Sequence, residues 1–190
     1  MKNNEFITSD NHFFHENVIK YSNRPFRDKH EMNEKMIMAW NNKVPRDAIL
    51  YHVGDFSFGK AEDTLKILNR LNGTIRLIKG NHDKINPLIK DKFDWIKDYY
   101  ESKTEDGRKI VMCHYPLLTW NGAHRGSWQL HGHCHHSLER INQYTTRFDV
   151  GVDSTPKYSP LTPYAPYSFG EIKKIMDKRE YVNIDHHEKR

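Results

Sequence analysis

Cysteine is scarce in this chain: Cys113 and Cys134 are the only two among 190 residues. So few thiols exclude a cysteine-rich metal cluster and favour free thiols in a reducing compartment. We expect both to be small buried groups beside a polar site, with metal binding by sulfur as the less favoured alternative. The sequence also lacks an apolar run of membrane-spanning length and a signal-peptide core behind Met1. These absences predict a cytoplasmic protein without a membrane partner.

A strong excess of one charge is missing as well. The net charge is +5, and residues 171–190 carry six Lys and Arg against five Asp and Glu. Such a mixed distribution favours anionic partners only weakly, so a nucleic-acid partner is allowed but not favoured. Hydrophobic residues make up 36% and charged residues 29%, which is typical of a folded chain with a well-solvated surface. The length suits a single domain over residues 1–190, and the oligomeric state stays open.

Short apolar segments alternate with helical patterns along the chain. Met32, Met36 and Trp40 recur every four residues, which predicts a helix over 30–43 with one buried face. Ser168 and Glu171 have the spacing of a capping box and predict a last helix that begins after Ser168. Another helix is expected at 60–71, strands at 5–8, 48–53, 74–79, 108–113, 129–131 and 147–152, and irregular loop at 154–167. Strands that alternate with helices predict a layered α/β domain.

Five polar clusters follow apolar segments, each at the end of an expected strand. They read Asp10-Asn11-His12, Gly54-Asp55, Gly80-Asn81-His82-Asp83, His114 and Gly132-His133-Cys134-His135. Loops at the ends of adjacent strands are where α/β sheets place their sites, so we expect the clusters to converge. Carboxylate, carboxamide and imidazole groups are the ligands that divalent Mn, Fe, Ni or Zn prefer. The set therefore indicates a hydrolase with two metal ions.

Spacing within the clusters supports this convergence. Asp10 and His12 are two residues apart, as are His133 and His135, so the side chains of each pair can face the same way in an extended loop. Glycines at the start of three clusters permit backbone conformations and close approaches that larger residues would resist. Each pair can therefore reach one metal pocket.

The succession D-x-H, G-D, G-N-H-D, H and G-H-x-H over residues 10–135 resembles the calcineurin-like metallophosphoesterase superfamily. Stretches at 23–26, 120–122 and 150–153 also resemble a small, uncapped phosphoesterase group of bacteria and their phages. The resemblance implies an α/β fold of two packed mixed β-sheets flanked by helices. It also implies two bound divalent metal ions, with manganese preferred over Fe, Ni or Zn.

The same resemblance implies seven metal ligands and one catalytic residue. The first ion would be held by Asp10, His12 and His135, the second by Asn81, His114 and His133, and Asp55 would bridge the two. His82 would bind no metal. Instead, it would stabilise the transferring phosphoryl group or protonate the leaving oxygen.

The charges of this ligand set agree with phosphate binding. Two divalent ions give about +4, the carboxylates of Asp10 and Asp55 about −2 and a bridging hydroxide about −1, which leaves about +1 to attract an anionic ester. The neutral carbonyl of Asn81 keeps that remainder, whereas a third carboxylate would bring the sum to about zero. Two ions about 3.5–4 Å apart can activate a shared water for attack on phosphorus and can bind the phosphoryl oxygens.

Other side chains are candidates for supporting roles. Four residues are candidate substrate contacts, namely Arg24, His124, Trp120 and His15. Trp120 could stack on a nucleobase, although an anchoring role within its loop explains the residue equally well. We expect Asp83 to orient the site through hydrogen bonds, and His52 and His131, which lie inside strands, to be packing or supporting groups.

Together these features predict hydrolysis of a small phosphodiester or a nucleotide-type phosphomonoester by metal-hydroxide attack. The chain is short for a fold with a large capping domain, so we expect an open site that accepts several esters. One alternative is a nuclease acting on DNA or RNA, which calls for a continuous basic groove. Another is a non-catalytic scaffold of the same fold, in which the histidine matched by His82 is typically lost. The physiological substrate and the preference between diester and monoester stay open.

Overall fold

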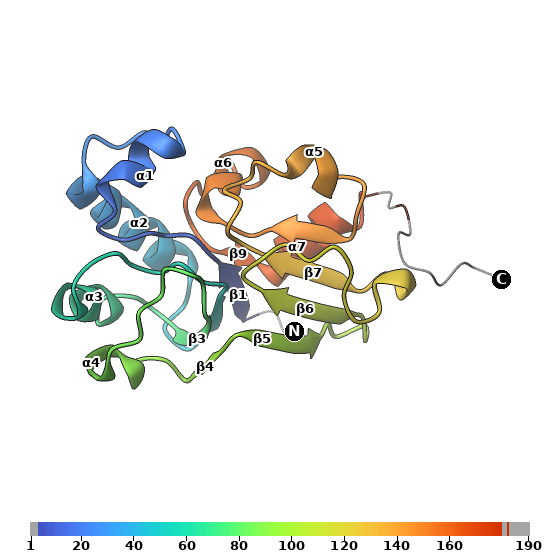
Figure 1. The fold of residues 1–190 in the computed structure, drawn as a ribbon, viewed down its shortest axis with the longest axis horizontal. Coiled ribbons are helices and arrows are strands. Elements are labelled where there is room, and N and C mark those ends of the chain that lie inside the picture. The colour runs from blue at the N-terminus through green and yellow to red at the C-terminus, as the bar shows by residue number, and fades with distance from the viewer. Residues whose placement is uncertain (1–3, 180–181, 183–190) are drawn as a thin grey trace.

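The computed structural model describes residues 4–179 and residue 182, which form two β-sheets with helices around them (Figure 1). The strands are β1 (Glu5–Thr8), β2 (Ile49–His52), β3 (Thr74–Ile78), β4 (Trp95–Lys97), β5 (Tyr99–Lys103), β6 (Lys109–Cys113), β7 (Trp128–His131), β8 (Arg147–Asp149) and β9 (Tyr167–Ser168). The helices are α1 (Glu16–Tyr21), α2 (Lys29–Lys43), α3 (Ala61–Leu68), α4 (Pro87–Lys90), α5 (Glu139–Asn142), α6 (Thr155–Tyr158) and α7 (Phe169–Met176). Within this described part, each helix is too short or too polar to span a bilayer.

The first sheet has the strand order β4-β3-β2-β1-β9. β1 to β4 run parallel to one another, and β9 is antiparallel to β1. Thr8 pairs with His52, and His52 pairs with Leu77, so β1, β2 and β3 end almost level. The loops that carry the first three polar clusters therefore leave the sheet side by side.

The second sheet has the order β5-β6-β7-β8, in which only the β5–β6 pair is antiparallel among the described strands. His131 at the end of β7 pairs with Asp149 at the end of β8. Beyond β8, Gly151 forms a parallel bridge to Ser9, just after β1. This bridge brings the site loops of the two sheets together at one edge.

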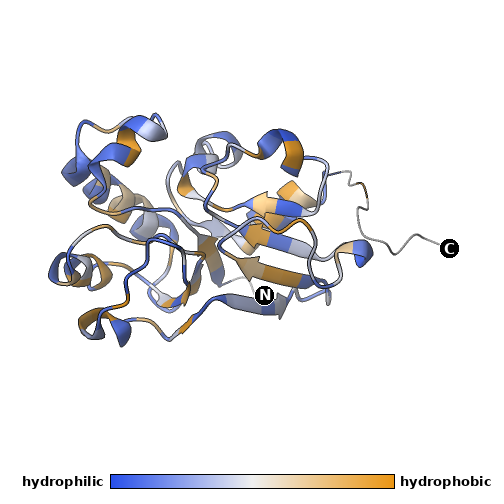
Figure 2. Cartoon of the chain, viewed as in Figure 1, coloured by the Kyte–Doolittle hydropathy of each residue, from blue (hydrophilic) through white to orange (hydrophobic). Residues whose placement is uncertain are grey.

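The two sheets pack face to face, and helices cover the outer face of the first sheet. Alternating residues on β1 and β2 point to opposite faces. Phe6 and Leu50 join a core formed with α2, α3 and α4, whereas Ile7 and Tyr51 join a second core with residues of β6, β7, β8 and α7. Figure 2 shows hydrophobic residues on β1 and along most of β6. The structure is thus an α/β fold of two packed mixed sheets flanked by helices, as the sequence predicted.

Local sequence signals explain where the main helices begin. The Asp28 carboxylate accepts hydrogen bonds from the backbone N–H groups of His30 and Glu31, which starts α2. The predicted apolar face of α2 is confirmed, since Met32, Met36 and Trp40 are fully buried. The capping box of Ser168 and Glu171 that was expected before α7 is also present.

Three predicted boundaries were wrong. α3 ends at Leu68 instead of continuing to residue 71, because Asn72 is hydrogen-bonded to the end of α2. The Trp40 indole donates to the Asn72 carbonyl, and the Asn72 side-chain amide donates to Val44 O. β8 ends at Asp149 instead of residue 152, because Gly151 leaves that sheet for its bridge to Ser9. The expected loop at 154–167 contains α6, whose first turn holds a proline with its φ already set for a helix.

Candidate metal centre

Hydrogen bonds between neighbouring loops hold the first two polar clusters in place. The Asp10 N–H donates to Gly54 O at 3.0 Å, and the His12 N–H donates to Asp55 O at 3.1 Å. From the second sheet, the His133 N–H donates to both carboxylate oxygens of Asp10, at 3.1 and 3.0 Å. Backbone and side-chain bonds thus fix the loops after β1, β2 and β7 against one another.

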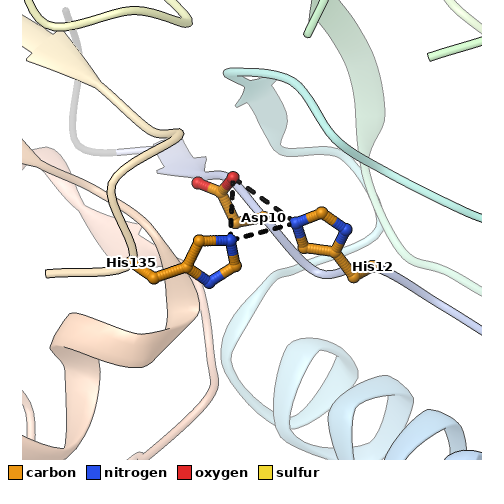
Figure 3. Close-up of side chains that lie close together, drawn as sticks. All are labelled: Asp10, His12 and His135. Atoms are coloured by element: carbon orange, nitrogen blue, oxygen red, sulfur yellow. Dashed lines mark hydrogen bonds and ion pairs between the residues drawn. The ribbon is translucent and has the colours of Figure 1, made fainter. Parts of the chain in front are cut away.

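Asp10, His12 and His135 form the first group of converging side chains (Figure 3). The Nε2 atoms of the two histidines lie 3.2 Å apart. Asp10 Oδ1 is 3.7 Å from His12 Nε2 and 3.9 Å from His135 Nε2. One carboxylate oxygen and two imidazole nitrogens therefore face a common point, an arrangement that suits a divalent metal ion.

A second group gathers around His114. Its Nε2 lies 3.5 Å from Asp55 Oδ2 and 3.1 Å from Asn81 Oδ1. The same Asn81 oxygen is 3.0 Å from Nδ1 of His133. The four residues come from the loops after β2, β3, β6 and β7, and they bring two imidazole nitrogens and two oxygens together.

Both carboxylates lie between the two groups. Asp10 belongs to each of two sets of possible metal ligands, one with His12 and His135 and one with Asp55 and His114. Asp55 Oδ2 is 3.7 Å from His12 Nε2, almost as close as it is to His114. The structure thus brings together all seven ligands expected from the sequence, and the assignment of the bridge to Asp55 stays a prediction.

The backbone of this cluster is strained in a consistent way. Left-handed φ angles between 45° and 70° occur at five of the expected ligands, namely Asp10, His12, Asp55, His133 and His135. A side chain disfavours this conformation, at a cost on the order of 1–3 kcal/mol for each residue, and such strain concentrates at functional sites. Its accumulation here supports a functional role for the cluster.

Two glycines confirm the expected need for close approach. Gly54 has φ +92°, and a Cβ there would lie 2.5 Å from His114 Nδ1 and 2.7 Å from the Gly80 Cα. A Cβ on Gly132 would overlap the Asp10 carboxylate and lie 2.8 Å from the Ser9 Cβ. Any side chain at these two positions would displace an expected ligand.

The electrostatics of the cluster favour a cation. Burial alone would raise the pKa of Asp10, but the adjacent His12 ring and the charges of His135 and His114 hold it well below its usual range. Burial alone would lower the pKa of His114, but Asp55 and Asp10 raise it to about 9. The charges of Asp55 and Asp10 thus favour the protonated form of the His114 imidazole. A divalent ion would satisfy the same negative charge and displace that proton, so the donor set fits a metal.

Arg24 does not fit the substrate contact that we expected. The side chain is only 3% exposed, and its guanidinium donates to the carbonyls of Asp10 and Asn11 at 2.7 and 2.9 Å. It also forms a bidentate ion pair with Asp153, at 2.8 Å for each oxygen. Asp153 Oδ2 lies 2.6 Å from His135 Nδ1. The prediction was wrong because Arg24 is buried behind the cluster, where it holds the Asp10 loop.

Asp83 orients the site through hydrogen bonds, as expected. Its carboxylate accepts from the backbone N–H groups of Asp55, Phe56 and Gly80, each at 2.8 Å. Burial raises its pKa. The bonds tie the loop after β2 to the loop after β3, which places Asn81 next to the second group of ligands.

His82 and His15 lie at the edge of the cluster. His82 is exposed, and its ring centroid is 5.9 Å from that of His12. The His82 backbone N–H donates to Asp55 Oδ1 at 2.9 Å. The ring of His15 is 5.5 Å from His12 and stacks on Phe58 at 4.0 Å. Phe58 also lies 4.6 Å from the His82 ring, a position that its sequence context did not reveal.

Trp120 and His124 lie in the loop between β6 and β7. The Trp120 indole donates to Ser127 O at 3.2 Å, which agrees with the anchoring role that was considered for it. Arg125 Nε donates to His124 Nε2 at 2.9 Å. Their roles as substrate contacts stay predictions.

The remaining polar candidates are supporting groups, as expected. His52 and His131 are fully buried, with hydrogen bonds to Asn11 Oδ1 at 2.9 Å and to the Asn142 amide at 3.1 Å. Both cysteines are free, but they are only partly buried, so the expectation of two buried thiols was wrong. Partial burial still raises the pKa of the Cys134 thiol to about 11.

Fold and site together define an α/β protein with a candidate metal centre at the ends of its strands. MJ1445, an uncharacterised protein of Methanocaldococcus jannaschii, is 35% identical over 183 residues, which cover 93% of each chain. The chain therefore belongs to the same protein family as MJ1445. No protein-family model matches it.

Two other similarities extend over most of the chain. The Gene 66 protein of Mycobacterium phage D29 is 26% identical over 187 residues, which cover 83% of this chain and 92% of the phage protein. The crystal structure of AQ665 from Aquifex aeolicus, a protein of unknown function, aligns with a TM-score of 0.67 and 25% identity, over 90% of this chain and 98% of that one. Vps29 from Entamoeba histolytica in complex with Zn²⁺ aligns at 15% identity with a TM-score of only 0.36, too weak to support an argument.

Proposed function

We propose that this protein is a metal-dependent phosphoric ester hydrolase of the calcineurin-like metallophosphoesterase superfamily. One observation carries the proposal: Asp55 Oδ2 lies 3.7 Å from His12 and 3.5 Å from His114, so a carboxylate stands between two groups of ligands. Two adjacent groups joined in this way suit a pair of divalent ions better than one.

The residues divide between the two ions as the sequence resemblance implies. Asp10, His12 and His135 would hold one ion, and Asn81, His114 and His133 the other, with Asp55 between them. When bound, such a pair supplies an activated water and positive charge for the phosphoryl oxygens. We propose Mn²⁺ as the native metal, with Fe, Ni or Zn as the alternatives that the same ligands accept.

His82 is the proposed catalytic residue. Its backbone N–H is anchored to Asp55, whereas its ring is exposed beside the cluster, where a bound ester would lie. An imidazole in that position can donate a proton to the leaving oxygen or a hydrogen bond to the phosphoryl group. Among the described residues, His82 belongs to neither set of candidate His, Cys, Asp and Glu ligands.

The proposed substrate is a small phosphodiester or a nucleotide-type phosphomonoester. Asn81, His82 and His133 are all exposed, so the cluster opens directly to solvent. An open site of this kind accepts small esters without the movement of a lid. A nuclease would need further contacts along a strand, and strong cleavage of a DNA or RNA strand with little turnover of nucleotide-sized esters would favour that alternative.

The proposal is tested by restoring single metals to the metal-stripped protein. We expect hydrolysis of p-nitrophenyl phosphate or bis(p-nitrophenyl) phosphate to be absent after stripping and to return with Mn²⁺. His82→Ala should keep its metal and lose about 10²–10⁴-fold in kcat, the usual contribution of a positioned acid. His30→Ala, an exposed histidine on α2, is the matched control and should behave as the unmodified protein. Full turnover by His82→Ala would show that His82 has no catalytic role.

A further inference from the structure

A cavity of about 310 Å³ opens beside the proposed catalytic histidine, between the loop after β2, α3 and α4. His82 forms part of its wall. Its lining is mostly apolar and aromatic, with Phe56, Phe58, Leu77, Ile85, Ile89 and Phe93. Leu77 and Phe56 are almost fully buried, so the floor belongs to the protein core and is formed before any ligand arrives.

Phe58 connects this cavity to the metal cluster. Its ring lies 4.6 Å from that of His82 and 5.2 Å from that of His12. His15 stacks on it at 4.0 Å and holds it in place. Although Phe58 is surrounded by these rings, 41% of the residue is exposed. A large aromatic side chain left open to solvent beside a cluster of polar ligands favours a role in binding.

Besides His82, the polar part of the lining is formed by Ser57, Lys60, Thr64, Asp83, Lys84 and Asn86. The Asp83 carboxylate accepts three backbone hydrogen bonds, so it has little capacity left for a ligand. Lys60 and Lys84, both exposed, belong to the same lining. An apolar floor with a basic rim suits a planar, uncharged ring that carries an anionic group at one end.

We infer that this cavity binds the leaving group of the phosphate ester, and that this leaving group is a nucleoside. The base would lie on the apolar floor next to Phe58, which places the ester oxygen near His82. In the reaction, a water oxygen forms a new bond to phosphorus while the bond from phosphorus to the nucleoside oxygen breaks. That oxygen takes a proton from His82, and the attacking water loses a proton to solvent, from which His82 is reprotonated. The products are phosphate and a free nucleoside. The inference rests on the proposed function.

The kinetic test compares two esters that differ only in the base. AMP and ribose 5-phosphate release chemically similar primary alcohols, so a difference in kcat/KM reports contacts with the base. We expect AMP to be favoured at least about fivefold, the lower end of what one stacked base contributes. Ile85→Trp, which fills the cavity, should reduce that ratio towards one. Met38→Trp, at an exposed position on α2 away from this cavity, is the matched control and should keep it.

The binding test needs no hydrolysis. Adenosine added to the full-length protein should shift the amide NMR signals of residues around the cavity, and ribose should not. The shifts should vanish in Ile85→Trp and persist in Met38→Trp. Phe58→Ala gives a second way to weaken adenosine binding if Ile85→Trp does not fold.

Failure of this inference can be distinguished from failure of the proposed function. Adenosine binding at this cavity without hydrolysis of any ester would support the inference about the cavity and overturn the proposed function. Hydrolysis with equal kcat/KM for AMP and ribose 5-phosphate, together with no adenosine binding, would overturn the inference and leave the proposed function standing. Adenosine shifts that survive Ile85→Trp would place the nucleoside elsewhere and also overturn the inference.

Discussion

Asp153 connects three distant parts of the chain through one carboxylate. It pairs with Arg24, 129 residues away in sequence, and contacts Nδ1 of His135 at 2.6 Å. Arg24 in turn donates to the carbonyl of Asp10. The contact at Nδ1 fixes the orientation of the His135 ring and leaves Nε2 facing Asp10 and His12, where a metal ligand is needed.

Replacing Asp153 should therefore weaken metal binding although the residue is not an expected ligand. Asp153→Asn removes the charge that pairs with Arg24 and leaves an amide that can donate to His135 in place of accepting. We expect metal affinity to fall about 10–100-fold, measured by competition with a chromophoric chelator. Asp94→Asn is the matched control, because Asp94 also accepts from an arginine, Arg76, but at the edge of the first sheet. Unchanged affinity in Asp153→Asn would contradict the assigned role.

Gly132 offers a test of how tightly the loops pack. A Cβ at this position would overlap the Asp10 carboxylate, and the neighbouring backbone is held by hydrogen bonds. We expect Gly132→Ala to lower the free energy of unfolding by about 1–3 kcal/mol, as overpacking does in a protein interior. Gly170→Ala is the control and should raise the free energy of unfolding. A Cβ at Gly170 would meet only Ser168 Oγ, at 3.9 Å, and alanine is favoured over glycine in a helix by about 0.5–1 kcal/mol. Urea unfolding of both variants would measure the difference.

At the scale of residues, the sequence located the candidate ligands but not the groups that hold them. Asp10, His12 and Asp55 stand in short local motifs beside expected strands, so their chemistry is visible in a few neighbouring letters. The role of Arg24 depends on Asp153, and the two meet only when the chain has folded. The burial of Arg24 could not be predicted from its neighbours in the sequence, which is why we expected Arg24 to contact the substrate.

Among the elements, α7 depends most clearly on a single side chain. Glu171 closes the capping box with Ser168, and it also accepts from Lys43 on α2 at 2.8 Å and from Ser159 Oγ at 2.8 Å. One carboxylate thus joins α7 to α2 and to the segment after α6. Burial alone would raise its pKa, but the bonds from Lys43, the Ser168 backbone and Ser159 lower it.

This lowered pKa predicts how stability changes with pH. A carboxyl whose pKa is lower in the folded state stabilises the fold above its unfolded pKa of about 4.5 and loses that contribution as the pH falls further. Glu171→Gln should therefore be less stable than the unmodified protein at pH 7 by about 1–2 kcal/mol, since Glu171 is only half-buried and solvent screens its charge. The difference should shrink below about pH 4.5, and Lys43→Gln should show the same trend. An equal difference at pH 3.5 and pH 7 would contradict the assignment.

The elements that the sequence revealed are those with a strong local pattern. α2 has its row of Met32, Met36 and Trp40, and α7 has its capping box. β4 and β5 carry no such pattern, because they lie at sheet edges with half-exposed faces that favour mixed residues. α4 and α6 are single turns with a proline at their start, and a proline between expected elements was more readily interpreted as loop.

In the whole molecule, the candidate centre joins the two sheets. Asp10, His12, Asp55 and Asn81 follow strands of the first sheet, whereas His114, His133 and His135 follow strands of the second. Each group of ligands draws on both sheets, so neither sheet alone could hold an ion in the arrangement described. The candidate centre thus lies where the strand ends of the two sheets meet.

The number of metal ions that bind at this centre tests the central claim most directly. The full chain would be saturated with Mn²⁺, freed of excess metal and analysed by elemental mass spectrometry against protein concentration, beside Asp55→Ala and the control His30→Ala. We predict two ions for each unmodified chain and for His30→Ala, and fewer than two for Asp55→Ala. One ion or none in the unmodified chain, or two ions retained by Asp55→Ala, would contradict a centre in which Asp55 stands between two metals.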